Sequence, residues 1–257
     1  MKVLDLFSGI GGFSLGLERA GMETVAFCEN DKFCQKVLAK HWPNVPVHNN
    51  IEELDGREYK GTVDLVCGGF PCTPFSVSGK QRGKEDDRFL WPEMLRVIRE
   101  VEPAWVIGEN VSGIIHMELD NVLSDLEGAG YSCQSFVIPA CGVDARHKRN
   151  RVWIVAHSSI KRLQRSEKTG DSLGSGTNRE QLSAGLSGVP RRNKSSNQPR
   201  MGGMVDGLSR WLDEPEGTPR VIGKVPDRTH RLKALGNAVV PQVVEVLGRM
   251  VMEIENE

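Results

Sequence analysis

Residues 3–12 have the sequence VLDLFSGIGG, a short apolar run that ends in glycines. A run of this length and composition predicts a buried parallel strand followed by a tight turn. The next stretch, residues 13–20, has apolar side chains at helical spacing, and Gly21 is its expected C-terminal stop. Glycines between a strand and a helix allow a ligand to approach the backbone closely. This stretch therefore predicts the first βα unit of an α/β domain with a ligand site at its turn.

Glu29 follows the second expected strand, 20 residues after Gly9. An acidic side chain at that place can accept hydrogen bonds from both ribose hydroxyls of a nucleoside. The combination is compatible with NAD, FAD or S-adenosylmethionine. A purely structural glycine turn also remains open on this pattern alone.

The same alternation of strands and helices continues to residue 157. Asp31 is the expected N-cap of a helix that ends before Pro43. Further strands are expected over residues 24–28, 63–67, 105–108, 135–138 and 152–156, and further helices over 88–101 and around 122–126. Strands that alternate with helices predict an α/β fold with a largely parallel, doubly wound, Rossmann-like sheet.

Composition excludes several classes of protein. The 33 Lys and Arg residues are balanced by 34 Asp and Glu, which excludes a uniformly basic nucleic-acid coat. No apolar run approaches the roughly 18 residues of a membrane span, and the N-terminus has no signal-peptide pattern. The six cysteines form no CxxC pair, so we expect free thiols, no metal site and a cytoplasmic location.

The composition changes after residue 157. Residues 158–200 contain nine Lys and Arg against three Asp and Glu and have no aromatic residue, so they bury too little apolar surface to fold tightly alone. Residues 201–228 regain apolar side chains. Residues 229–257 contain an expected Gly-Asn turn and an amphipathic helix that begins at Pro241 and should pack on the first domain. We therefore divide the chain into a catalytic domain (1–157), a small, irregular and partly flexible region (158–228) and a returning segment (229–257).

The segment GGFPCTPFS, residues 68–76, follows the strand that ends at Cys67. It places the thiol of Cys72 at the crevice where parallel sheets bind ligands. A single free cysteine is more often a small core residue than a nucleophile, but this strand-end position beside glycines favours a reactive thiol.

Six segments resemble, in order, the motifs of the cytosine-C5 DNA methyltransferase family. They cover most of residues 1–157 and 231–257, and their sequences are DLFSGIGGF, CEN, GGFPCTPFS, ENV, HKRNRVWIV and ALGNAVVPQ. The resemblance implies transfer of a methyl group from S-adenosylmethionine to C5 of a cytosine that has left the base stack of double-stranded DNA. It also implies that residues 158–228 occupy the place of a target-recognition region.

The resemblance assigns the catalytic residues one by one. Cys72 corresponds to the nucleophile that adds to cytosine C6, and Glu109 to the glutamate that contacts N3 and N4. Arg151 corresponds to the arginine that binds O2, and Arg149 to the one that supports the flipped base or its backbone. His147 replaces the family's usual glutamine two positions before Arg149.

The resemblance also assigns the cofactor residues. Glu29 would bind the ribose, and Asn50, where the family often has aspartate, would lie near the adenine. Asn237 and Val239 would close over the methionine part. The glycine turn would line the rest of the pocket with Phe7, Gly9, Gly11 and Gly12.

Other functions remain possible at this point. RNA methylation by a relative of the family is disfavoured by Thr73-Pro74-Phe75. A binding-only relative is disfavoured by the presence of Cys72, Glu109 and Arg151. An NAD-dependent oxidoreductase would leave GGFPCTPFS without a role. The resemblance and the compact size would suit a phage or prophage enzyme, and a cognate restriction endonuclease is a conceivable partner.

Overall fold

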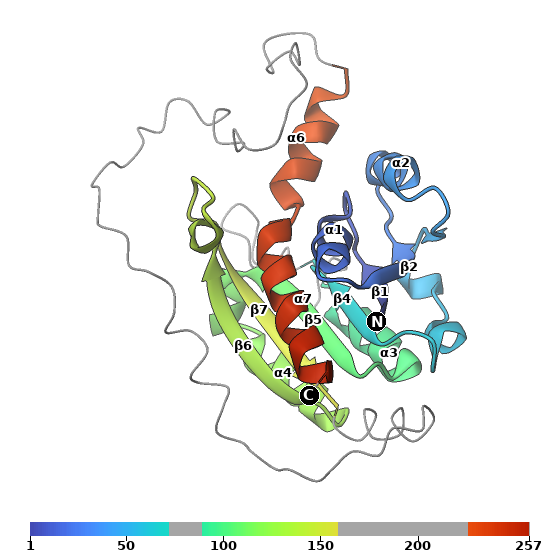
Figure 1. The fold of residues 1–257 in the computed structure, drawn as a ribbon, viewed down its shortest axis with the longest axis vertical. Helices are drawn as coiled ribbons and strands as arrows, with labels where there is room; N and C mark the ends of the chain where they lie inside the picture. The colour runs from blue at the N-terminus through green and yellow to red at the C-terminus, as the bar shows by residue number, and fades with distance from the viewer. Residues whose placement is uncertain (72–88, 159–225, 257) are drawn as a thin grey trace, which may run out of the picture.

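The computed structural model describes residues 1–71, 89–158 and 226–256. Its centre is a seven-stranded sheet with the strand order β3-β2-β1-β4-β5-β7-β6. Neighbouring strands are parallel from β3 to β5, whereas β7 is antiparallel to both β5 and β6. The strands are β1 (Lys2–Leu6), β2 (Glu23–Cys28), β3 (Val47–His48), β4 (Leu65–Gly68), β5 (Trp105–Val111), β6 (Ser132–Pro139) and β7 (Asn150–His157). The predicted α/β class with a largely parallel sheet is confirmed (Figure 1).

Helices and short 3₁₀ turns connect and cover these strands. The α-helices are α1 (Gly12–Arg19), α2 (Lys32–His41), α3 (Trp91–Val101), α4 (Leu119–Gly128), α6 (Arg228–Asn237) and α7 (Pro241–Asn256). The 3₁₀ turns are η1 (Ile51–Glu53), η2 (Gly56–Tyr59), η5 (Ser112–His116) and η6 (Ala140–Val143). Among the described helices, none is both long and apolar enough to cross a membrane.

The sheet is buried on both faces, as expected of a doubly wound fold. Successive residues of a strand point to opposite faces. Leu4 and Leu6 therefore pack in one core with α3 and α4, whereas Val3 packs in a second core with α1 and α7. Because β1 lies between β2 and β4, the strand order reverses beside β1, and such a switch point opens a crevice at the carboxyl ends of the strands.

The C-terminal helix α7 packs directly on α1, as the amphipathic pattern after Pro241 predicts. A Cβ atom on Gly16 would lie 2.5 Å from the Pro241 carbonyl oxygen and 2.6 Å from Cβ of Val244, so the two helices approach where α1 lacks a side chain. Burial of Val244, Leu247 and their neighbours on α7 completes the second core. This contact brings the last segment of the chain back to the glycine turn.

Three local features of the structure differ from what the sequence predicts. The expected turn at Gly236-Asn237 is the end of α6, whose only buried residue is Ala234, so no apolar periodicity marks this helix in the sequence. The strand expected to end at Gly108 continues to Val111, because β7 pairs with its last residues. The two-residue strand β3 is too short for a periodic signal.

Some expectations concern residues outside the described part of the chain. Cys72 lies there, as do residues 159–225 of the expected recognition region. The proposed division of the chain at residues 157 and 228 therefore stays a prediction.

Candidate active site

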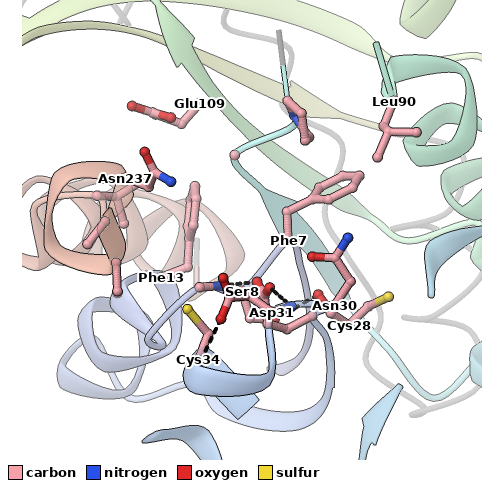
Figure 2. A pocket seen from close by; sticks show the side chains of 18 of the residues that line it. Phe7, Ser8, Phe13, Cys28, Asn30, Asp31, Cys34, Leu90, Glu109 and Asn237 are labelled. Carbon is pink, nitrogen blue, oxygen red and sulfur yellow. Dashed lines mark hydrogen bonds between the residues drawn. The ribbon is translucent and has the colours of Figure 1, made fainter. Parts of the chain in front are cut away.

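A cavity of about 990 Å³ lies at the switch point of the sheet. Its walls come from the residues that follow β1, β2 and β4, from the last part of β5, and from the chain between Lys233 and Val239. Figure 2 shows Phe7, Glu109 and Asn237 around this space, although these residues belong to three distant parts of the sequence. The cavity thus joins the glycine turn to the C-terminal segment.

Phe7 begins the glycine turn with a backbone φ of 52°, in the left-handed region that few non-glycine residues adopt. This conformation turns the chain out of β1 and leaves the Phe7 side chain in the cavity wall. Ser8 holds the turn in place, because its hydroxyl donates a hydrogen bond of 2.6 Å to the Asp5 carbonyl oxygen. The turn therefore presents backbone atoms and an aromatic ring to the cavity.

Glu29 lies at the end of β2, and its carboxylate is held by two backbone amides. The N–H of Gly9 donates to Oε2 at 2.7 Å, and the N–H of Asp31 donates to Oε1 at 2.7 Å. Each carboxylate oxygen keeps a further lone pair for another donor. Glu29 has no ion-pair partner among the described residues, so its negative charge stays available to a polar ligand in the cavity wall.

Asp31 connects Glu29 to the C-terminal segment. Its Oδ1 accepts the amides of Phe33 and Cys34 and so caps α2, as predicted, while its Oδ2 lies 3.1 Å from Nζ of Lys233 on α6. Burial alone would raise the pKa of Asp31, but the bonds from Lys233 and the two amides hold it below its ordinary value. Asp31 and Lys233 both line the cavity, and sequence reasoning assigned neither of them to the site.

Asn50 also lines the cavity, near Asn30 and Ile51. Its Oδ1 accepts the Glu52 amide at 3.2 Å and thereby caps the short turn η1. The amide group of Asn50 thus has a structural partner and still borders the space.

The glycine turn and the segment after α6 are in close contact. A Cβ atom on Gly12 would lie 2.8 Å from Cγ2 of Val239 and 3.2 Å from its carbonyl oxygen. Gly12, Asn237 and Val239 all line the cavity. Gly11 does not; a Cβ atom there would meet the Trp42 ring at 2.5 Å, so Gly11 serves packing against the end of α2.

Glu109 and Arg151 form an ion pair at the opposite side of the cavity. The Nε atom of Arg151 lies 2.9 Å from Oε1 of Glu109. Val111 pairs with Arg151 in the β5–β7 ladder, so Glu109 and Arg151 are diagonal neighbours on one face. Burial raises the pKa of Glu109 to about 7, against the opposing effects of Arg151 and Arg149. The carboxyl can therefore both release and retain a proton near neutral pH.

Arg149 precedes β7 with a φ of 33° and reaches across the cavity edge. Its Nη2 donates to the carbonyl oxygens of Gly236 at 2.8 Å and Ala238 at 2.9 Å. Those carbonyls belong to the last turn of α6 and to its C-cap residue, where a helix leaves acceptors without partners. Arg149 therefore joins the β6–β7 turn to the C-terminal segment.

Asn110 fixes the chain where it leaves β4. Its Nδ2 donates to the Phe70 carbonyl oxygen at 3.0 Å, and its Oδ1 accepts the Val111 amide at 2.9 Å. Asn110 is buried, and the Phe70 ring packs on Trp91 with a centroid distance of 5.1 Å. Pro71, the last described residue of this stretch, lines the cavity. Cys72, the next residue, lies outside the described part.

Two thiols of the described residues line the cavity, those of Cys28 and Cys34. Burial, reinforced by the nearby Glu29 charge, raises the pKa of Cys28 to about 12 and that of Cys34 to about 11. Both thiols therefore stay protonated at neutral pH, and neither is suited to act as a nucleophile. In the described part of the chain, no group of three or more His, Cys, Asp or Glu side chains could hold a metal ion.

The structure brings most of the predicted site residues to one cavity. These are Phe7, Gly9, Gly12, Glu29, Asn50, Glu109, Arg149, Arg151, Asn237 and Val239. Sequence reasoning missed Phe13, Asn30, Asp31 and Lys233, which share the same wall. Asn30 and Asp31 follow Glu29 directly, so a search of the residues beside that carboxylate would have found them.

A family model described as C-5 cytosine-specific DNA methylase matches residues 1–202. This chain belongs to that family. The curated methylases to which it is similar include the type II methyltransferase M.PspPI of Psychrobacter, 39% identical over 161 residues. M.Eco47II of Escherichia coli is 38% identical over 165 residues, and M.HhaI of Haemophilus parahaemolyticus is 32% identical over 169 residues.

The matched regions are only part of these methylases. The alignments with M.PspPI and M.Eco47II cover 60% of this chain and 39% of each relative, and the alignment with M.HhaI covers 64% and 51%. The chain thus spans about two fifths to one half of the length of these curated relatives.

Solved structures of similar fold include a Spodoptera frugiperda DNMT2 variant, with a TM-score of 0.53, 25% identity, and coverage of 61% of this chain and 50% of that one. A prophage-encoded E. coli protein described as a DNA modification methyltransferase has a TM-score of 0.53 and 26% identity, over 63% of this chain and 48% of its own. The seven-stranded mixed sheet of this family member is thus shared with methyltransferase structures.

Proposed function

We propose that this protein methylates cytosine at C5 in double-stranded DNA with S-adenosylmethionine as the methyl donor. The observation that carries the proposal is the Glu109–Arg151 pair in the wall of the cavity that also contains Glu29 and the glycine turn. One part of the cavity is suited to a nucleoside ribose, and another presents an acid and a guanidinium to a base edge. Membership of the C-5 cytosine-specific methylase family supports this assignment.

The residues on the cofactor side fit S-adenosylmethionine. Glu29 has a buried carboxylate, anchored by Gly9 and Asp31, that can accept the two ribose hydroxyls. We assign Asn50 to the adenine, and Asn237 and Val239 to the methionine part, with Phe7 and the glycine turn between them. When bound, S-adenosylmethionine supplies an electrophilic methyl group.

The residues on the base side fit a cytosine that has left the stack. In the proposed reaction the thiolate of Cys72 forms a bond to C6, which makes C5 nucleophilic enough to take the methyl group. Protonated Glu109 donates a hydrogen bond to N3 and offsets the charge that enters the ring, while its other oxygen accepts from the N4 amino group. Arg151 holds O2, and Arg149 supports the base or its backbone. Water then takes the proton from C5, and the electron pair of that C–H bond expels the Cys72 thiolate from C6, which restores the aromatic ring.

The assignment of the nucleophile to Cys72 rests on the family resemblance and on the unsuitability of the other thiols near the cavity. Cys28 and Cys34 line the cavity but have pKa values raised far above neutrality, and Cys141 is exposed on η6 and does not line it. Pro71 brings the chain to the cavity wall immediately before Cys72. Cys72→Ser should therefore abolish methyl transfer and spare cofactor binding.

Duplex DNA that contains 5-fluorocytosine tests the covalent step, because fluorine cannot leave C5 as a proton. The wild-type protein and Cys34→Ala should form a denaturation-resistant adduct, whereas Cys72→Ser should not. Bisulfite sequencing of DNA from cells that express the protein tests turnover and reads out the methylated site. Turnover by the serine variant, or methylation without an adduct, would refute the covalent mechanism.

The partners follow from the proposed reaction. The substrate is double-stranded DNA, and residues 158–228 are assigned to its recognition on the basis of their place in the sequence. Because the similar curated methylases bear type II names, a restriction endonuclease of the same specificity is the protein partner that we propose. Resistance of the methylated DNA to one such endonuclease would support this pairing.

A further inference from the structure

Two basic segments border the mouth of the cavity. They are the β6–β7 turn (residues 144–151) and helix α6, which together contain seven Lys and Arg against one acidic residue in a chain of net charge −1. Figure 1 shows the β6–β7 turn and α6 projecting beyond the sheet on the same side, at the top of the view. A cluster of positive charge therefore lies on the two elements that border the cavity.

Three of these seven cations have partners inside the site. Arg151 pairs with Glu109, Lys233 pairs with Asp31, and Arg149 binds backbone carbonyls. The side chains of the other four are exposed and form no ion pair or hydrogen bond with any residue in the described ranges. These four, which we name the phosphate rim, are Arg146, Lys148, Arg228 and Arg231.

Arg149 fixes the two halves of the rim relative to each other. Its guanidinium, which starts from the β6–β7 turn, donates to the carbonyls of Gly236 and Ala238 at the end of α6. Lys233 and His230 tie the other side of α6 to α2, the latter through a stacked contact with Phe33 at a centroid distance of 6.0 Å. The rim cations are thus attached to elements that are themselves held at the cavity.

We propose that the phosphate rim binds the DNA backbone on both sides of the target cytosine. This inference rests on the proposed function. A base that enters the cavity carries its own phosphates to the mouth, and duplex DNA presents one negative charge for about every 1.7 Å of its axis. The exposed Lys and Arg side chains on the two elements that border the mouth complement this charge. Contacts to phosphates set the position of the protein on DNA and carry no sequence information directly.

Two double variants test the rim, Arg146→Gln/Lys148→Gln on the turn and Arg228→Gln/Arg231→Gln on α6. The matched control is Lys40→Gln/Arg99→Gln, which also removes two exposed charges, each from the last turn of a helix that returns to the amino edge of the sheet. Fluorescence anisotropy with S-adenosylhomocysteine and a labelled duplex gives the slope of log affinity against log salt. Each lost phosphate contact reduces the slope by about 0.9, so each rim variant should lose up to about 1.8 and the control nothing.

The affinity for methylated-site duplex and for scrambled duplex should fall by the same factor in both rim variants. Calorimetry with S-adenosylhomocysteine should give the wild-type dissociation constant for each variant, which shows that the variant is folded. If a double variant is not folded, the single variant Lys148→Gln or Arg228→Gln takes its place. If the salt-dependence slopes of the rim variants equal that of the control, the proposed role of the phosphate rim is refuted. It is also refuted if the loss of affinity is confined to the duplex that contains the methylated site. If the wild-type protein methylates DNA but the rim variants keep its salt-dependence slope, only the proposed role of the rim is refuted. If the rim variants alter the slope of DNA binding but the wild-type protein methylates no DNA, only the proposed function is refuted.

Discussion

Nε of Arg151 lies 2.9 Å from Oε1 of Glu109, across the diagonal of the β5–β7 ladder. The pair explains how a buried carboxyl can titrate near neutral pH. Burial raises its pKa to about 7, and without the two arginines it would be raised further. Antiparallel pairing of β7 with β5 holds the two side chains on one face, so the acid that would donate to a cytosine and the arginine that would bind its O2 are positioned together.

Glu109→Gln should make the pH dependence of stability shallower. The folded-state pKa of Glu109 is about 7 against an ordinary value of 4.5, so the folded protein binds more protons than the unfolded chain between these values. This contribution is fully present below pH 4.5 and is lost as pH rises through 7, by about 3 kcal/mol in total. Denaturant unfolding from pH 5 to 8.5 measures it. An identical pH dependence in wild type and variant would show that Glu109 is ionised throughout.

Asp5 provides an internal comparison for that experiment. It is fully buried, and burial raises its pKa to about 7 although Ser14 donates to it at 2.7 Å. Wild-type stability should therefore fall with pH through both groups, and Glu109→Gln should remove only one part of the fall.

Glu29→Ala should weaken S-adenosylhomocysteine binding by about ten- to a hundredfold. Loss of a hydrogen bond to a charged acceptor is worth about 1.5–3 kcal/mol. Calorimetry measures the dissociation constant, and Glu23→Ala, which removes an exposed carboxylate from the start of the same strand, is the control. A dissociation constant equal to that of the control would place the ribose elsewhere.

Asn110→Ala should slow methyl transfer more than it weakens cofactor binding. The variant loses the bond to the Phe70 carbonyl and leaves that acceptor buried, at a cost of about 1–3 kcal/mol in stability. The residues that follow Phe70 lead to Cys72, so kcat should fall while the dissociation constant of S-adenosylhomocysteine is unchanged. Asn121→Ala, which removes an exposed amide bonded to Glu118, should leave both values unchanged. A wild-type kcat in Asn110→Ala would exclude a positioning role.

Gly12→Ala should destabilise the protein by about 1–3 kcal/mol and weaken cofactor binding. The added methyl group would lie 2.8 Å from Val239 Cγ2, and overpacking of this kind displaces the neighbouring backbone. Gly128→Ala is the control, because nothing lies within 4 Å of its added methyl group at the end of α4, and it should stabilise by up to about 1 kcal/mol. Thermal unfolding with and without S-adenosylhomocysteine separates the two effects. Equal behaviour of the two alanine variants would contradict the close contact between the glycine turn and Val239.

Much of the fold is determined by short-range patterns. The apolar run before Phe7, the capping residue Asp31 and the proline at residue 241 mark element ends that the structure shows within a few residues. Glu29 could be proposed from the sequence because it follows a buried strand run, whereas Glu109 is assigned through the resemblance of the segment ENV to a family motif. Such signals are local, since they depend on periodicity, capping and backbone restriction within one element.

The arrangement of the site was decided only by the tertiary structure. Helix α6 buries Ala234 alone, and its position depends on contacts with Asp31, Phe33 and Arg149 from other parts of the chain. The extension of β5 to Val111, which aligns Glu109 with Arg151, exists because β7 returns antiparallel beside it. The periodicity of the sequence does not predict which strands become neighbours in the sheet. It also does not predict which backbone carbonyls a distant arginine contacts. These contacts form because packing brings residues more than 80 positions apart together, as in the bond from Arg149 to Gly236.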